Sequence, residues 1–247
     1  MRADNFSLDK YFERIGFADS VNADLNTLSR LMSAQLRSVP FENTEVQAGR
    51  IPSLKPEDIV QKIIHDKRGG YCYELNGLFA MALEAIGFEY YFLAARPMTY
   101  AERRPKTHMV VVVCLGGEKY LCDCGFGGYG LRAPIKIGEN TQDELLGERF
   151  FLQIKDGEYL LSTQITGDKA AQYAFADTAQ EWIEFGLANY FNATHPNTIF
   201  TQKKLAIIQT PNGRIMLVDD RLKVVENGLA TEETVVHEEA FKKYFMR

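Results

Sequence analysis

Hydrophobic residues in the first third of the chain recur at the spacing of amphipathic helices. Apolar side chains repeat every three to four positions, the period of a helix that buries one face. The runs cover residues 8–15, 25–36, 59–64 and 75–86. Residues suited to helix starts or ends flank them, namely Ser7, Gly16, Asn22, Pro56 and Gly87. The pattern predicts a helical domain over residues 1–88, with Asn22 capping its second helix.

The pattern then changes to short runs rich in β-branched and aromatic residues, separated by turn signals. These runs cover residues 88–94, 108–114, 119–123, 150–154 and 159–162. Closely spaced strands of this kind favour an antiparallel barrel or sandwich. Helical spacing returns at residues 182–190. We therefore predict a second, β-rich domain over residues 89–193.

The last part of the chain predicts a smaller α+β unit over residues 194–247. Apolar runs at 204–209 and 214–219 flank Thr210-Pro211-Asn212-Gly213. Asn-Gly between two such runs is a strong hairpin signal. A third strand is expected at 222–225 and a terminal helix from Glu238. The predicted fold class is α+β.

Composition and charge exclude several classes of function. With 247 residues, 46% hydrophobic and 25% charged, the chain can bury the core of a globular protein. Its net charge of -5 lacks the basic footprint of a nucleic-acid-binding protein. The apolar stretch 78–95 is interrupted by Glu84, Gly87 and Glu89. We therefore expect neither a nucleic-acid partner nor a membrane span.

The cysteines and the N-terminus bear on the cellular compartment. Residues 1–17 mix charged and apolar side chains and contain no apolar core of a secretory signal. Cys72, Cys114, Cys122 and Cys124 could in principle form two disulfides. Without a signal peptide, free thiols in a reducing cytoplasm are the expectation.

One cysteine stands where a thiol ionises most readily. Cys72 follows Gly69 and Gly70, which predict a turn, and it opens the fourth helical run. Amide N–H groups in the first turn of a helix lack internal partners and carry partial positive charge, so they stabilise a thiolate. The alternative is a small residue packed in the core. Cys72 is therefore a candidate nucleophile.

A base and an orienting carboxylate follow in the chain. His108 opens an apolar strand, and Asp123 lies between Cys122 and Cys124. A positioned imidazole can take a thiol proton, and a carboxylate on its other nitrogen stabilises the cation. An unpaired buried carboxylate is costly, so a pair with His108 would account for Asp123. The order Cys, His, Asp predicts a catalytic triad.

Five separated motifs resemble those of the arylamine N-acetyltransferase family. In chain order they are Val39-Pro40-Phe41-Glu42-Asn43, Arg68-Gly69-Gly70-Tyr71-Cys72, Thr107-His108-Met109, Asp123-Cys124-Gly125-Phe126-Gly127 and His195-Pro196-Asn197-Thr198-Ile199-Phe200. They follow the family's order from residue 39 to residue 200. Cys122 and Cys124 stand where the family typically has valine or similar residues. Both replacements are small and apolar, so the role expected of Asp123 is unchanged.

The resemblance implies a fold, an activity and further site residues. The fold would be an N-terminal helical bundle, a central antiparallel β-barrel and a C-terminal α/β lid, with a cysteine-protease-like catalytic core. An acetyl group would pass from acetyl-CoA, a co-substrate with no permanently bound cofactor beside it, to an arylamine, hydrazine or arylhydroxylamine. The role would be in xenobiotic metabolism. Coenzyme A would contact Thr107, Gly125, Phe126, Gly127, Gly128 and Phe200, and the acceptor amine would contact Phe41 and Phe126.

Several alternatives stay open at this point. A peptide hydrolase, a transglutaminase or a macrolactam-forming amide synthase could use the same triad, and a thiol-rich binding module would need no reactive cysteine. Cys122 and Cys124 are closer in sequence than the usual zinc pair, so we expect packing cysteines and no metal site. Arg103, Arg104 and Lys106 either attract an anionic cofactor or form a solvated loop.

Overall fold

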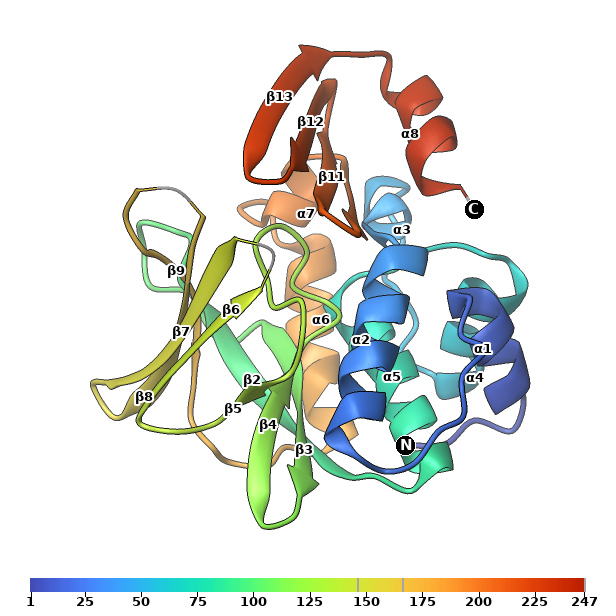
Figure 1. The fold of residues 1–247 in the computed structure, drawn as a ribbon. Helices are drawn as coiled ribbons and strands as arrows, with labels where there is room; N and C mark the ends of the chain where they lie inside the picture. The colour runs from blue at the N-terminus through green and yellow to red at the C-terminus, as the bar shows by residue number, and fades with distance from the viewer. Residues whose placement is uncertain (146, 166, 247) are drawn as a thin grey trace.

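The helices of the N-terminal region pack around α5 (Cys72–Ile86), which is buried from Cys72 to Leu83. The computed structural model describes residues 1–145, 147–165 and 167–246. Figure 1 shows α5 between the other helices and the sheet. The other helical elements of this region are α1 (Leu8–Ile15), α2 (Leu25–Ser38), α3 (Thr44–Gln47), α4 (Pro56–Val60) and a π-helical continuation of α4 over Gln61–His65. A helix that is apolar on nearly every face must lie inside a domain, which explains the central place of α5.

The predicted helix signals hold except at the start of α2. Ser7 caps α1 and Gly16 ends it in the left-handed conformation. The prediction of Asn22 as the cap of α2 is wrong, because Asp24 takes this position and its carboxylate accepts a hydrogen bond from the Thr27 amide at 2.8 Å. Either side chain can cap a helix, but a carboxylate also places negative charge at the positive end of the helix dipole.

The central sheet is a nearly closed antiparallel barrel, as the resemblance implied. Its strand order is β5-β4-β3-β2-β9-β8-β7-β6, and the edge strands β5 and β6 contact each other. The strands are β2 (Glu89–Pro97), β3 (His108–Leu115), β4 (Glu118–Cys122), β5 (Ile135–Lys136), β6 (Asn140–Leu145), β7 (Glu148–Lys155), β8 (Glu158–Gln164) and β9 (Ala170–Phe175). Strands β5, β6 and β9 were not predicted. β6 is largely polar and exposed, so it lacks the apolar alternation on which strand prediction depends.

The C-terminal unit is a second antiparallel sheet with a helix against it. A turn over Trp182–Glu184 leads into α6 (Phe185–Thr194) and α7 (Ile199–Gln202). The sheet order is β1-β10-β11-β12-β13, so β1 from the helical region completes it. Its elements are β1 (Phe41–Glu42), β10 (Leu205–Thr210), β11 (Gly213–Val218), β12 (Arg221–Glu226), β13 (Leu229–Thr234) and α8 (His237–Phe245). The fold is therefore α+β, as predicted.

The predicted hairpin is present, but its loop lies one residue earlier than the Asn-Gly signal suggests. Thr210 pairs with Gly213, which leaves Pro211 and Asn212 as the two loop residues. Gly213 belongs to β11, where a Cβ atom would lie 1.8 Å from the Val225 carbonyl oxygen. Glycine is therefore required here by the close approach of β12 and not by the turn.

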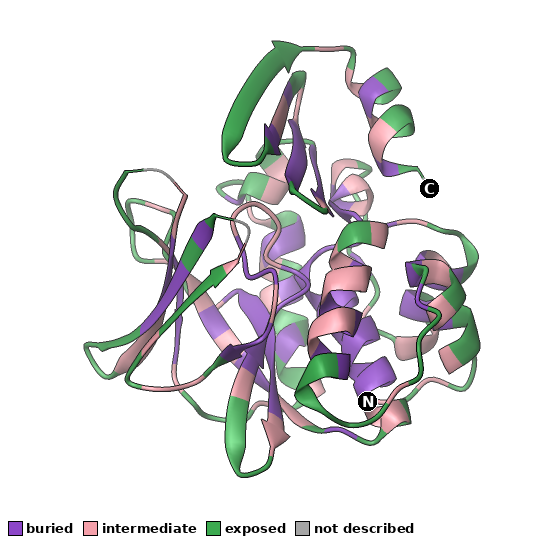
Figure 2. Cartoon of the chain, in the orientation of Figure 1, coloured by how far each residue is buried: buried purple, intermediate pink, exposed green. Residues whose placement is uncertain are grey.

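Burial follows this arrangement. Figure 2 shows buried residues where α5 meets the barrel and exposed residues along β13. One large apolar core joins the helices, the barrel and the first strands of the C-terminal sheet, and a smaller one lies between that sheet and α8. No helix in the described ranges combines the length and hydropathy needed to cross a bilayer.

Candidate active site

Cys72 is the first residue of α5, as predicted, but the two glycines before it do not form a left-handed turn. The positive φ in this segment belongs to Lys67, at 53°. Gly69 is needed because a Cβ atom there would lie 2.2 Å from the Pro40 carbonyl oxygen. Gly70 lies beside Phe41 in a parallel bridge, which lets β1 pass directly against the strand that enters α5. The glycines thus permit close packing, and that packing fixes where the helix starts.

His108 and Asp123 come together because β3 and β4 are adjacent strands. His108 opens β3, and Asp123 follows the last residue of β4. The His108 Nε2 atom lies 2.7 Å from Asp123 Oδ2, and the two residues are 4% and 1% exposed. This burial keeps water from competing for the pair, so the ring orientation is set by the carboxylate. Nδ1 is the ring nitrogen left for Cys72.

Asn76 also binds Asp123, and sequence analysis missed it. Its Nδ2 donates to Asp123 Oδ1 at 3.1 Å and to the Met109 carbonyl at 2.7 Å, while its Oδ1 accepts from the Cys124 amide at 2.8 Å. Asp123 Oδ1 also accepts the Gly125 amide at 2.8 Å. Asn76 lies one helical turn after Cys72, and an amide side chain in the mostly apolar stretch over residues 75–83 is the signal that could have revealed it.

The electrostatics of the three groups favour a charged imidazole. Burial of the ring lowers the pKa of His108, but the Asp123 carboxylate and a hydrogen bond with Cys72 raise it, and the result is about 10. The ring therefore holds a proton easily once the thiol has given one up. Such an arrangement can form a thiolate–imidazolium pair at neutral pH.

Cys72 and His108 line a cavity of about 400 Å³. Of the residues expected at the site, those that line it are Phe41, Cys72, Thr107, His108, Gly125, Phe126, Gly128 and Phe200. Gly127 instead lines a small recess behind the cavity, where a Cβ atom would lie 3.1 Å from Phe41 and Ile207. Asp123 also lies behind the cavity wall. The cavity thus presents sulfur, imidazole and aromatic faces together, which suits a small aromatic substrate.

Several lining residues could not be found from sequence because they come from distant elements. They include Tyr100, Gln172, Phe191, Asn192 and Met216. Arg104 reaches the cavity, with its guanidinium 4.6 Å from the centre of the Tyr100 ring. Arg103 and Lys106 instead form ion pairs with Glu158 at 3.5 and 3.1 Å. Of the three basic residues singled out in this loop, one therefore faces the cavity.

The other cysteines are free thiols within the described ranges. Cys122 and Cys124 are 0% and 4% exposed, and burial, together with the nearby Asp123 charge, raises the pKa of both thiols well above its usual value. No cluster of three or more histidine, cysteine or acidic side chains that could hold a metal occurs among the described residues. The Cys122 and Cys124 thiols are therefore poor nucleophiles at neutral pH.

A thiol at a helix start, an imidazole and a carboxylate beside one cavity are typical of enzymes that transfer acyl groups through a cysteine. The chain matches an N-acetyltransferase family model over residues 24–247. An arylamine N-acetyltransferase of Mycolicibacterium smegmatis is 32% identical over 91% of this chain and 84% of its own length. One from Escherichia coli (strain K12) is 30% identical over 92% of this chain and 82% of its own length.

A solved structure agrees with these relatives. The Mycobacterium marinum arylamine N-acetyltransferase in complex with CoA has a TM-score of 0.91 at 25% identity, over 97% of this chain and 92% of that chain. The chain belongs to the arylamine N-acetyltransferase family. It is an acyltransferase, and the hydrolase, transglutaminase and amide synthase alternatives are not favoured.

Proposed function

We propose that this chain transfers the acetyl group of acetyl-CoA to an arylamine, hydrazine or arylhydroxylamine through an acetyl-Cys72 intermediate. The observation that carries the proposal is that Cys72 and the His108–Asp123 pair meet at one aromatic-lined cavity. The relative from Mycobacterium marinum, solved in complex with CoA, supports acetyl-CoA as the donor. The aromatic lining, with Phe41, Phe126 and Phe200, supports a flat aromatic acceptor.

The first half-reaction begins with transfer of the Cys72 thiol proton to His108. The thiolate attacks the thioester carbonyl carbon of acetyl-CoA, and a tetrahedral oxyanion forms. Amides in the first turn of α5 have no partner within the helix and are the donors for this oxyanion. The C–S bond to coenzyme A then breaks, and the imidazolium returns its proton to the leaving thiolate. Acetyl-Cys72 and free coenzyme A result.

The second half-reaction runs the same chemistry in reverse with an amine. The amine nitrogen attacks the acetyl-Cys72 carbonyl while neutral His108 takes a proton from that nitrogen. The C–S bond to Cys72 breaks, and the N-acetyl product leaves with the thiolate–imidazolium pair restored. Asp123 stays ionised throughout, because its role is to orient the ring and stabilise the imidazolium.

The cavity residues divide between the two substrates in this proposal. Thr107, Gly125, Phe126, Gly128 and Phe200 contact coenzyme A, and Phe41 and Phe126 contact the acceptor. Gly127 shapes the loop from behind. The enzyme works in the cytoplasm, which its free thiols support. It acetylates foreign aromatic amines, which the apolar lining of the cavity supports.

Bisubstrate kinetics tests the proposed function. Initial rates measured at varied acetyl-CoA and varied aromatic amine should give parallel double-reciprocal lines, the pattern of a ping-pong enzyme. The Cys72→Ala variant should show no transfer, whereas the matched Cys114→Ala variant should behave as the wild type. Intersecting lines, or transfer that survives in Cys72→Ala, would overturn the two-step mechanism.

A further inference from the structure

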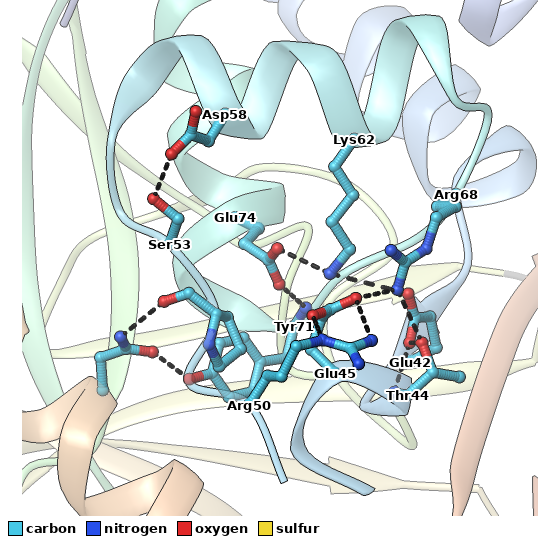
Figure 3. Close-up of polar contacts among 12 residues, drawn as sticks. Glu42, Thr44, Glu45, Arg50, Ser53, Asp58, Lys62, Arg68, Tyr71 and Glu74 are labelled. Atoms are coloured by element: carbon cyan, nitrogen blue, oxygen red, sulfur yellow. Dashed lines mark hydrogen bonds and ion pairs between the residues drawn. The ribbon is translucent and has the colours of Figure 1, made fainter. Parts of the chain in front are cut away.

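A buried group of charges lies directly behind the first turn of α5. Lys62, from the π-helical segment, reaches between two carboxylates, with its Nζ atom 2.7 Å from Glu74 Oε1 and 3.8 Å from Glu42 Oε1 (Figure 3). The exposed fractions of these side chains are 12% for Lys62, 2% for Glu74 and 1% for Glu42. Two buried acids therefore share one lysine.

The neighbouring cations are already engaged. Arg68 and Arg50 each lie 2.5 Å from a carboxylate oxygen of Glu45, and Arg68 also donates to the Thr44 hydroxyl at 3.0 Å. Burial raises the pKa of Glu74, Lys62 lowers it, and the Glu42 charge raises it further. With Glu74 ionised, the charges of Glu42, Lys62 and Glu74 sum to one negative charge. Lys62 therefore limits the negative potential behind α5.

Both acids are tied to the segment that carries the nucleophile. Glu74 is the third residue of α5, and its Oε2 accepts a hydrogen bond from the Tyr71 amide at 3.1 Å. The amide of Glu42 donates to the Gly70 carbonyl at 2.9 Å. A Cβ atom on Gly70 would lie 2.8 Å from Glu74 Oε2, so glycine at this position lets the carboxylate reach the amide.

We propose that Lys62 is a positioning residue for Cys72. It holds Glu74 against the Tyr71 amide, and its positive charge keeps the negative charge of that carboxylate from destabilising the Cys72 thiolate. The inference rests on the proposed role of Cys72 as nucleophile. Cys72 lines the cavity, whereas Lys62 and Glu74 lie outside its described lining, so Lys62 acts through the helix start and not through substrate contact.

The charges around Cys72 and Lys62 determine whether each substitution favours or disfavours the Cys72 thiolate. Cys72 is faced by His108, Tyr73 and Tyr71. Lys62 is faced by Glu42 from β1, Glu74 from α5 and, further away, Glu45 from α3. Replacing Lys62 by methionine doubles the net negative charge of the group, which disfavours a thiolate at the start of α5. Replacing Glu74 by glutamine removes one negative charge, keeps an oxygen for the Tyr71 amide, and has the opposite effect.

The test follows alkylation of Cys72 by iodoacetamide against pH, with peptide mass spectrometry to identify the site. We expect Lys62→Met to raise the pH midpoint by about one unit and to slow the reaction up to about tenfold at a pH below both midpoints, with the rate recovering at high pH. Glu74→Gln should lower the midpoint. The Lys62→Met/Glu74→Gln double variant, which restores the wild-type sum of charges, should return to within about threefold of the wild-type rate.

Controls separate this inference from general damage. Lys62→Arg should retain the wild-type profile, as should Lys10→Met, which removes an exposed lysine paired with Glu13. Binding of coenzyme A to Lys62→Met should change less than about twofold, because the cavity is untouched. If Lys62→Met does not fold, Glu74→Gln and the double variant still give predicted midpoints.

The outcomes that overturn the inference differ from those that overturn the proposed function. A folded Lys62→Met variant with wild-type alkylation, or slowed equally at every pH, would refute the role of Lys62. A midpoint for Glu74→Gln at or above the wild-type value would do the same. Acetyl transfer that survives in Cys72→Ala would instead refute the proposed function, whatever Lys62 does.

Discussion

Replacing Asp123 by asparagine should abolish most of the activity while leaving the fold intact. The carboxylate accepts three hydrogen bonds: from His108 Nε2 at 2.7 Å on one oxygen, and from Asn76 at 3.1 Å and the Gly125 amide at 2.8 Å on the other. An asparagine has one oxygen and one NH₂ group, so it can satisfy only one side of this arrangement.

Both orientations of the new amide are unfavourable. If its NH₂ group faces His108, Nε2 must accept, and the ring proton moves to Nδ1, where it prevents the ring from taking the Cys72 proton. If its oxygen faces His108, the NH₂ group meets the donors of Asn76 and Gly125. Neither arrangement stabilises an imidazolium, whose pKa of about 10 depends on the Asp123 charge. The expected loss in turnover is about a thousandfold to ten-thousandfold, as for comparable triads.

The assay is release of coenzyme A with saturating acetyl-CoA and an aromatic amine. The matched control is Asp177→Asn, because Asp177 is an exposed aspartate that pairs with Lys119 at 2.7 Å, and this variant should keep wild-type turnover. Circular dichroism and the urea midpoint establish that both variants are folded. A folded Asp123→Asn variant within about tenfold of wild-type turnover would refute the role given to this carboxylate.

Three further predictions concern reactivity, stability and pH. Iodoacetamide at neutral pH should alkylate Cys72 well before buried Cys122, and acetyl-CoA should protect it; peptide mapping that finds Cys122 labelled first would contradict the site. Arg214→Met should lower the free energy of unfolding by about 3–5 kcal/mol in urea titration, because it leaves the buried Glu148 carboxylate without its partner; an unchanged midpoint would show that the pair adds nothing. Because the pKa of His108 is raised from 6.5 to about 10, the protonated ring stabilises the folded state fully below pH 6.5, and this contribution is lost as the pH rises through about 10. The free energy of unfolding of wild type should therefore exceed that of His108→Gln by less at pH 10 than at pH 7; a difference that grows with pH would contradict this direction.

The elements with strong periodicity or punctuation could be predicted from sequence. Helices α1 and α5 follow their caps and apolar spacing, and the β10–β11 hairpin follows its turn residues. Strands β6 and β13 could not be predicted, because exposed strands lack apolar alternation. The division of the chain at residues 88 and 193 stays a prediction, since one continuous core joins the regions on both sides.

Prediction of the active site from the sequence has the same limits. The sequence motifs pointed to Cys72, His108 and Asp123, and the structure places them together. Asn76 could not be assigned, because its role depends on contacts between elements far apart in the chain. Arg104 was named with Arg103 and Lys106, but the sequence could not tell which of the three lines the cavity. The glycines before Cys72 were expected to form a turn, yet Gly69 serves close packing, which only the position of Pro40 reveals.

The acetyl group on Cys72 is the most direct test of the account. The protein is incubated with acetyl-CoA in the absence of any amine, and peptide mass spectrometry then locates the modification. A thioester is already activated, so exchange onto a cysteine is nearly balanced and the intermediate should persist until an amine arrives. We expect one acetyl group on Cys72, removed on addition of an aromatic amine with formation of the N-acetyl product. An unmodified Cys72 in a preparation that turns over, or an acetyl group that the amine does not take, would contradict the account.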